Sequence, residues 1–148
     1  MSDELRASNR ALASRGRWAA AAMAAALSGL LIAAAWAVPD ARGFGTHEQL
    51  GLAPCQFRSF TGHACPSCGM TTAWAYLVRG DVPRALKANM AGAVLGAAAM
   101  AAVPWLLFAA ASGVWLWRAP CLEPILYVGT LWLALVALDW VRRMATGM

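Results

Sequence analysis

The sequence predicts an all-α protein, an integral membrane helical bundle with three full transmembrane helices and one short or re-entrant helix. Hydrophobic residues make up 61% of its 148 residues, and charged residues make up only 13%. Soluble domains are about 45–50% apolar and about 25% charged, so the excess apolar surface must face lipid or a protein partner. The basic residues stand at the edges of long uncharged runs, as membrane topology signals do. Despite the net charge of +5, we therefore expect no nucleic-acid binding.

The first part of the chain combines a basic tail, residues 1–17, with an uncharged run at 18–38. As a helix this run is roughly 31 Å long, which matches the hydrocarbon core of a bilayer. A cleaved signal peptide is the competing interpretation, because Ala35-Trp36-Ala37 resembles a cleavage site. The run exceeds the apolar stretch of about 7–15 residues in signal peptides, so we expect an uncleaved helix. Residues 18–148 then form one transmembrane domain.

The rest of the chain divides into a loop and three apolar runs. Residues 39–63 are rich in glycine and proline, which predicts a loop with little regular structure. The run at 64–78 is uncharged but too short for an ordinary transmembrane helix. The runs at 90–113 and 124–141 are long enough to span a bilayer.

A few polar and small residues at these runs have structural explanations. Asn89 stands where it would cap the helix that follows. Gly92 and Gly96 form a G-x-x-x-G pattern, which allows another helix to approach closely. Asp139 and Arg142 have the i, i+3 spacing of an ion pair on one helix face.

The distribution of basic residues favours a fourth crossing by residues 64–78. In that arrangement the basic tail contributes four Lys and Arg residues to one side, the 79–89 loop three and the C-terminal end two, against three on the other side. The positive-inside rule then places both termini in the cytoplasm. The composition, rich in alanine and arginine, suggests a bacterial protein of the inner membrane that crosses it several times. A re-entrant hairpin is the alternative for residues 64–78.

The chemistry of the chain is concentrated in its four cysteines, Cys55, Cys65, Cys68 and Cys121. Pro66 suits the first position of a helix, so we expect Cys65 to be the N-cap of the short helix, with Cys68 on the same face. A helix N-terminus presents free N–H groups and a partial positive charge, which lower the pKa of a cysteine.

The first interpretation of this motif is thiol–disulfide redox chemistry. Cys65 and Cys68 would be the redox-active, catalytic pair, with Cys55 or Cys121 as a further thiol. His63 would tune the thiols, and Gly69 and Thr71 would support the motif as part of the helix start. The sequence leaves open whether the chain is an enzyme.

Two other interpretations remain open. A metal site, for zinc or another metal, would use Cys55, Cys65 and Cys68 with a fourth ligand from His63, His47 or Cys121. Alternatively, the cysteines are structural, and the chain is a scaffold or accessory subunit without a cofactor. Covalent haem is disfavoured because C-x-x-C is followed by Gly69 and not by histidine. The expected partners are the lipid bilayer and a membrane protein or a second copy of the chain.

The stretch from Cys55 to Asn89 resembles a family of small bacterial membrane proteins known as domain of unknown function 2752 (DUF2752). The residues that carry the resemblance are Cys55, Thr61-Gly62, Cys65-Pro66, Cys68-Gly69, Thr71, Ala73, Gly80-Asp81 and Asn89. Thr72 stands where that family usually has arginine, and Met90 where proline is common. The resemblance implies a membrane protein with a cysteine motif, and it implies no activity.

Overall fold

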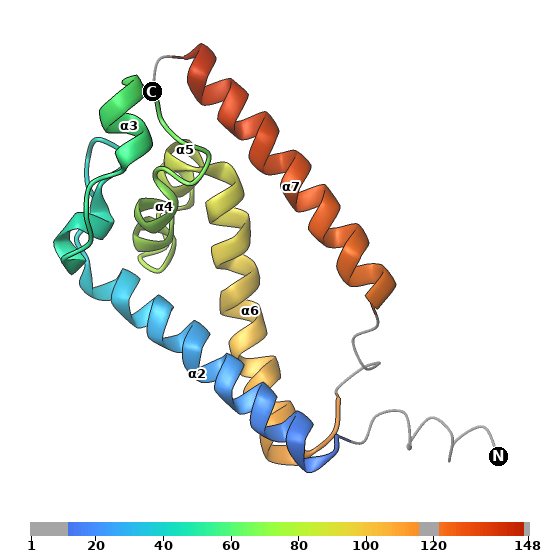
Figure 1. Ribbon diagram of the computed structural model, residues 1–148. Helices are drawn as coiled ribbons and strands as arrows, with labels where there is room; N and C mark the ends of the chain where they lie inside the picture. Colours follow the sequence, from blue (N-terminus) through green and yellow to red (C-terminus); the bar gives the residue numbers. More distant parts are fainter. Residues whose placement is uncertain (1–11, 116–121, 147–148) are drawn as a thin grey trace.

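The computed structural model describes residues 12–115 and 122–146, and every regular element in these ranges is a helix (Figure 1). The elements are α2 (Ser14–Trp36), the 3-10 helix η1 (Thr46–Leu50), α3 (Gln56–Thr61), α4 (Met70–Leu77), α5 (Val82–Ala88), α6 (Met90–Ser112) and α7 (Leu122–Ala145). Three of them, α2, α6 and α7, are long and apolar enough to cross a membrane. The predicted fold class is therefore confirmed, and the chain has the features of a multi-pass membrane protein.

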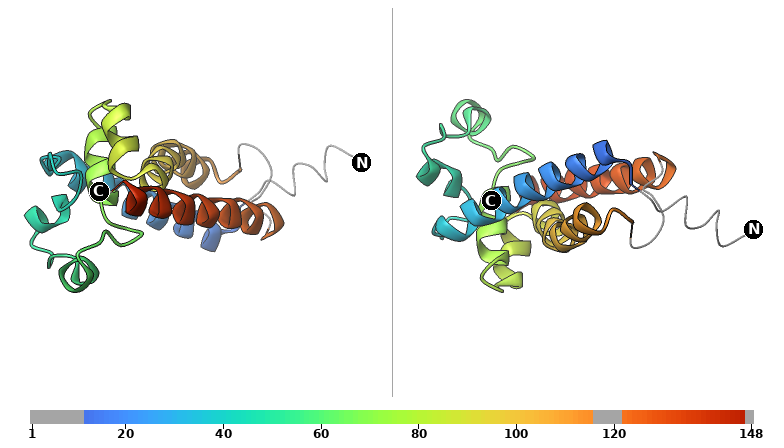
Figure 2. Two further views of the ribbon diagram at one scale, coloured as in Figure 1. Left: turned by 90° about the horizontal axis from the view of Figure 1, so that it is seen from above. Right: turned by 90° about the horizontal axis from the view of Figure 1, so that it is seen from below.

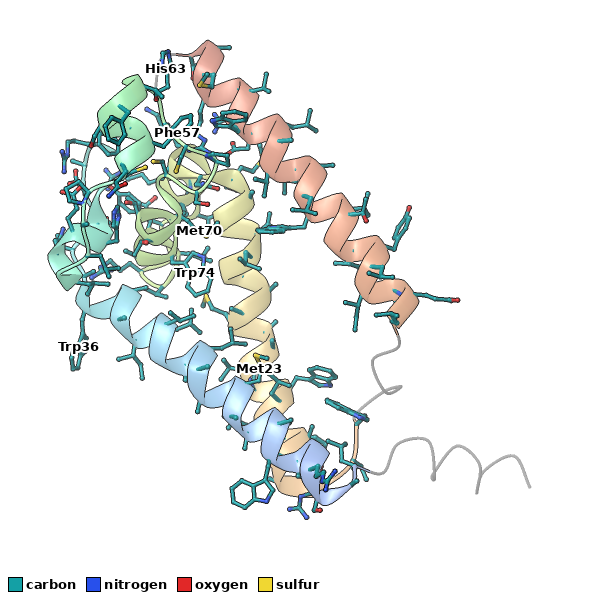
Figure 3. All side chains as sticks on the ribbon, in the orientation of Figure 1. Met23, Trp36, Phe57, His63, Met70 and Trp74 are labelled. Atoms are coloured by element: carbon teal, nitrogen blue, oxygen red, sulfur yellow. The ribbon has the colours of Figure 1, made fainter. Side chains whose placement is uncertain are left out.

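The helices α2 and α6 run in opposite directions and form a V (Figure 1). They meet at the closed end, where Ala20 and Ala24 are buried against Leu106. Alanine side chains let two helix backbones approach closely there. At the open end, the V is filled by the short helix α4, whose Trp74 is buried between Ala34 and Ala99 (Figure 3).

The glycines of α6 set how closely α4 approaches it. A Cβ atom on Gly92 would lie 3.1 Å from Met70, and one on Gly96 would lie 3.0 Å from Leu77. Trp74 also donates a hydrogen bond of 2.9 Å from its indole nitrogen to the carbonyl of Gly92. The close contact expected from the G-x-x-x-G pattern is thus present, and its partner is the short helix rather than a long one.

Arginine side chains satisfy the last carbonyls of both arms of the V. Arg17 donates to the carbonyls of Ala110 and Ala111, at the C-terminal end of α6. Arg79 donates to three carbonyls at the C-terminal end of α2, those of Ala34, Ala35 and Ala37. The last four carbonyls of a helix have no partner within the helix, and lipid offers none either.

The segment from 37 to 89, which holds η1, α3, α4 and α5, gathers at the open end of the V together with the C-terminal end of α7 (Figures 1 and 2). Arg143 of α7 donates a hydrogen bond of 2.7 Å to the carbonyl of Cys68. The predicted four-crossing arrangement puts these two residues on opposite sides of the membrane, so it is wrong.

The short apolar run explains this correction. Residues 64–78 form a helix only over Met70–Leu77, which is about 12 Å long and cannot cross a bilayer. Its lack of charge reflects burial among other helices, with Ala73, Trp74 and Ala75 all buried. An uncharged run in a membrane protein can therefore be an internal helix as well as a spanning one.

With three crossings, we expect the N-terminal end of α2 and the C-terminal end of α7 on opposite sides of the membrane. Epitope tags before residue 1 and after residue 148 can be tested by protease digestion of right-side-out and inside-out vesicles. Each tag should be cleaved in only one vesicle type, and not the same one. Cleavage of both tags in the same vesicles would contradict the arrangement.

Candidate functional site

Three cysteines converge at the open end of the V. The sulfur atoms of Cys55, Cys65 and Cys68 all lie within 4.8 Å of one another, and none forms a disulfide. The Sγ atoms of Cys65 and Cys68 are 3.2 Å apart. Cys68 is buried, whereas Cys55 and Cys65 are half-buried. The fourth cysteine, Cys121, lies outside the residues that the structure describes.

Cys65 and Cys68 belong to a turn that precedes a helix, and not to the helix itself. The amide of Cys68 donates to the carbonyl of Cys65 over 3.1 Å. Pro66 takes the second position of this turn, where its fixed φ is favourable. The helix α4 begins at Met70 with Gly69 as its N-cap, so the prediction that Cys65 caps the short helix is wrong.

Gly69 makes this geometry available. Its φ is +82°, in the left-handed region that other residues rarely adopt. A Cβ atom there would lie 2.6 Å from the carbonyl oxygen of Gly43 and 2.7 Å from that of Ala88. Glycine at this position therefore both reverses the chain after the cysteines and lets the turn pack directly on two neighbouring backbone segments.

Two side chains from different helices hold the cysteine turn. Asn89 donates from Nδ2 to the carbonyls of Pro66 and Cys68, over 3.2 and 3.0 Å. Arg143 donates to the same two carbonyls, over 2.8 and 2.7 Å. Because the hydrogen bonds from Arg143 involve a charged donor, they are among the stronger ones in the structure.

The side chains of Asn89 and Arg143 are themselves fixed by other contacts. Asn89 is fully buried, and its Oδ1 accepts the amide of Gly92, so the predicted N-cap of α6 is confirmed. Arg143, only 3% exposed, pairs with buried Asp139 over 3.0 Å. The predicted pair of Asp139 and Arg142 is also present, at 2.8 Å. Sequence reasoning had counted Arg143 only as a topology charge and missed its part in the site.

The pKa values of the thiols differ from the sequence prediction. Burial, together with hydrogen bonds to the other two thiols, raises the pKa of Cys68 to about 12, so this thiol is protonated at neutral pH. The pKa of Cys55 is lowered, chiefly because the backbone N–H of Arg58 points to its sulfur. Cys55 is the N-cap of α3, so the helix N-terminus acts on this cysteine and not on the C-x-x-C pair.

The other residues predicted to support the motif lie around it. His63 is exposed, with its Nδ1 atom 2.7 Å from the carbonyl of Thr61, and it lies at the outer tip of the molecule (Figure 3). Among the described residues, neither His63 nor His47 is part of the group of possible metal ligands that the three cysteines form. Thr71 is half-buried in the first turn of α4. The structure thus brings together three of the predicted cysteines and Gly69.

Residues 55–117 match the model of a protein family whose description is "Protein of unknown function (DUF2752)". The match begins at Cys55 and covers the cysteine turn, Asn89 and all of α6. It does not include α2 or α7, which contributes Arg143. No curated protein and no solved structure matches the chain.

Gly69→Ala should destabilise the protein far more than Gly62→Ala. Both glycines have positive φ, so each substitution carries a backbone cost of about 1–2 kcal/mol. Only at position 69 does the new methyl group meet backbone oxygens, and nothing lies within 4 Å of a Cβ at position 62. Thermal unfolding in detergent measures the difference, and equal losses for the two variants would contradict the steric argument.

Arg143→Met should free the cysteine turn. The substitution removes both hydrogen bonds to the turn and the buried partner of Asp139, a loss of about 3–5 kcal/mol. The matched control is Arg142→Met, because Arg142 pairs with the same carboxylate but is 37% exposed, where a pair contributes about 0–1 kcal/mol. Thermal unfolding and the rate of Cys68 alkylation by N-ethylmaleimide should both separate the variants. If the two variants have the same unfolding temperature and the same alkylation rate, Arg143 does not hold the cysteine turn.

Proposed function

We propose that this chain, a member of the DUF2752 family over residues 55–117, is a membrane protein that binds a thiophilic metal ion through Cys55, Cys65 and Cys68. The observation that carries the proposal is the third sulfur. A disulfide uses two thiols, and Cys55 comes from a separate segment to meet the C-x-x-C turn. Thiolate ligands select zinc and copper(I) among the common metals.

The sulfur positions suit a metal better than a disulfide. Around zinc, with Zn–S bonds of about 2.3 Å, tetrahedral geometry separates two sulfurs by about 3.8 Å. That separation lies within the 4.8 Å span of the three thiols. Cys65 and Cys68 would move apart from 3.2 Å by a few tenths of an ångström, whereas a disulfide would bring them to about 2.05 Å.

The surroundings also favour a bound cation with three thiolates. Such a group carries a net negative charge, and the guanidinium of Arg143 donates to the backbone of Cys68 itself. Outer groups that orient metal ligands commonly tune a site in this way. Three protein ligands leave one further position on a tetrahedral ion.

The second candidate function is thiol–disulfide exchange, favoured by the 3.2 Å between the sulfurs of Cys65 and Cys68. In that reaction the two thiols become a disulfide and lose two electrons and two protons. A disulfide in an acceptor protein gains them and becomes two thiols. Cys55 would then be a bystander, which distinguishes this candidate from the metal site.

Metal analysis of purified, reduced protein tests the proposal. After addition of zinc and removal of the excess, the wild-type protein should hold about one ion per chain. Cys55→Ser, Cys65→Ser and Cys68→Ser should each lose most of it, whereas Ser67→Ala, an exposed position in the same turn, should retain it. Cobalt binding should give thiolate-to-metal absorption in the wild type and in Ser67→Ala only.

The result for Cys55 decides between the candidates. If Cys55→Ser holds as much zinc as the wild type, or if no variant or wild-type protein holds stoichiometric metal, the metal site is overturned. In that case, a disulfide between Cys65 and Cys68 that forms reversibly in a glutathione redox titration would support the exchange function.

A further inference from the structure

A cavity of about 500 Å³ lies beside the cysteine turn, and five basic side chains line it. They come from four parts of the chain: Arg42 from the loop after α2, Arg58 from α3, Arg84 and Lys87 from α5, and Arg143 from α7. No aspartate or glutamate belongs to the lining that the described residues form. So many cations around one space repel each other unless negative charge enters it.

Carboxylates outside the cavity offset only part of this charge. Arg42 pairs with Asp40 over 2.7 Å, and Arg84 with Asp81 over 3.1 Å. Arg143 has its own partner on α7. Within the described ranges, no carboxylate lies within ion-pair distance of Arg58 or Lys87. The cavity therefore retains two uncompensated positive charges.

One wall of the cavity holds its guanidinium groups in place without neutralising them. The ring of Phe44 contacts two arginines, with the Cζ atom of Arg58 at 3.5 Å and that of Arg42 at 4.9 Å from the ring centroid. Such contacts orient a guanidinium and leave its N–H groups free to donate. The Nη1 atom of Arg58 is buried and has no hydrogen-bond partner in the structure.

The two lining cations without a carboxylate partner, Arg58 and Lys87, are the observation that points to a ligand. An anion in the cavity would accept from Arg58 and lie near Lys87 at the same time. The fork of N–H groups on arginine matches the oxygens of phosphate particularly well.

We propose that this cavity binds a phosphate ester, with its phosphate among Arg58, Lys87 and their neighbours. The volume falls within the range of about 300–1,000 Å³ for small-molecule sites, so an organic group fits beside the phosphate. Phe44 and Tyr76 supply apolar wall for that group. The ester is the headgroup of an anionic phospholipid or a soluble phosphorylated molecule. Basic pockets at the ends of transmembrane helices are suited to lipid headgroups.

This site is distinct from the proposed metal site, although Cys68 lines both. None of the five basic residues is a proposed metal ligand, and the phosphate would be bound by nitrogen donors alone. The inference therefore does not depend on the outcome of the metal analysis.

Thermal unfolding of the full chain in a non-ionic detergent tests the proposal. Ligand that binds the folded state raises Tm in a concentration-dependent way, which yields an apparent affinity. The probes are glycerol 3-phosphate, detergent-solubilised phosphatidylglycerol and, as a net-neutral control, phosphatidylcholine. The test variant is Arg58→Gln with Lys87→Gln, and the matched control is Arg15→Gln, an exposed arginine of α2 outside the cavity lining.

We expect the wild type and Arg15→Gln to be stabilised equally, and the double variant to bind at least roughly tenfold more weakly. Stabilisation by phosphatidylglycerol alone identifies a lipid headgroup, whereas stabilisation by glycerol 3-phosphate as well identifies a soluble phosphate ester. Lys87→Gln alone, at an exposed position, keeps the test valid if the double variant has a lowered Tm without ligand. The proposal is overturned if neither probe raises Tm, or if the double variant responds as Arg15→Gln does.

Discussion

The backbone carbonyls of Pro66 and Cys68 are the point on which the rest of the structure depends. Each accepts a hydrogen bond from Asn89, at the start of α6, and another from Arg143, near the end of α7. These two donors come from opposite ends of the chain's second half. Through one turn, they connect the V of α2 and α6 to the third long helix. A buried carbonyl without such a partner would be costly, so the turn and the helices are stable only together.

This constraint explains how three cysteines stay close without a covalent bond between them. The turn cannot rotate about its own axis while Asn89 and Arg143 hold its carbonyls, and Gly69 fixes the direction in which the chain leaves it. Cys55 then needs only to begin α3 at the right place. The same rigidity buries Cys68, which raises the pKa of its thiol while no metal is bound and sets it apart from the half-buried sulfurs beside it.

Arg143 also relates the cysteine cluster to the basic cavity. Its guanidinium donates to the turn, pairs with Asp139 and lines the cavity, and five N–H groups in one plane are enough for all three. A ligand in the cavity and an ion at the cysteines would therefore sit on either side of one positive charge. Negative charge at either place would stabilise that buried cation.

The long helices could be predicted from the sequence because a spanning helix is defined by composition over its whole length. Their ends could not be predicted so well. The third run was expected at 124–141 and the helix continues to Ala145, since Asp139 and Arg143 neutralise each other inside the structure. The three ligand candidates of the metal interpretation were also predictable, because cysteine chemistry narrows the choice. The turn at residues 65–68 could not be predicted from the sequence, because Pro66 suits a turn as well as a helix start. The close packing around Gly69 selects the turn, and that packing is visible only in the structure.

The predicted four-crossing topology is wrong for a related reason: arginines near a membrane can have structural roles that do not depend on the side of the membrane. The positive-inside rule assumes that each Lys or Arg indicates the side of the membrane on which its segment lies. Here Arg17 and Arg79 close the C-terminal ends of α6 and α2, and Arg143 holds the cysteine turn. A helix end near lipid lacks water, so its carbonyls need a donor on whichever side they lie. Two further basic residues, Arg58 and Lys87, face the cavity. The basic residues of the 37–89 segment cap the end of α2 or line the cavity, so their charge carries little information about the side of the membrane on which the segment lies.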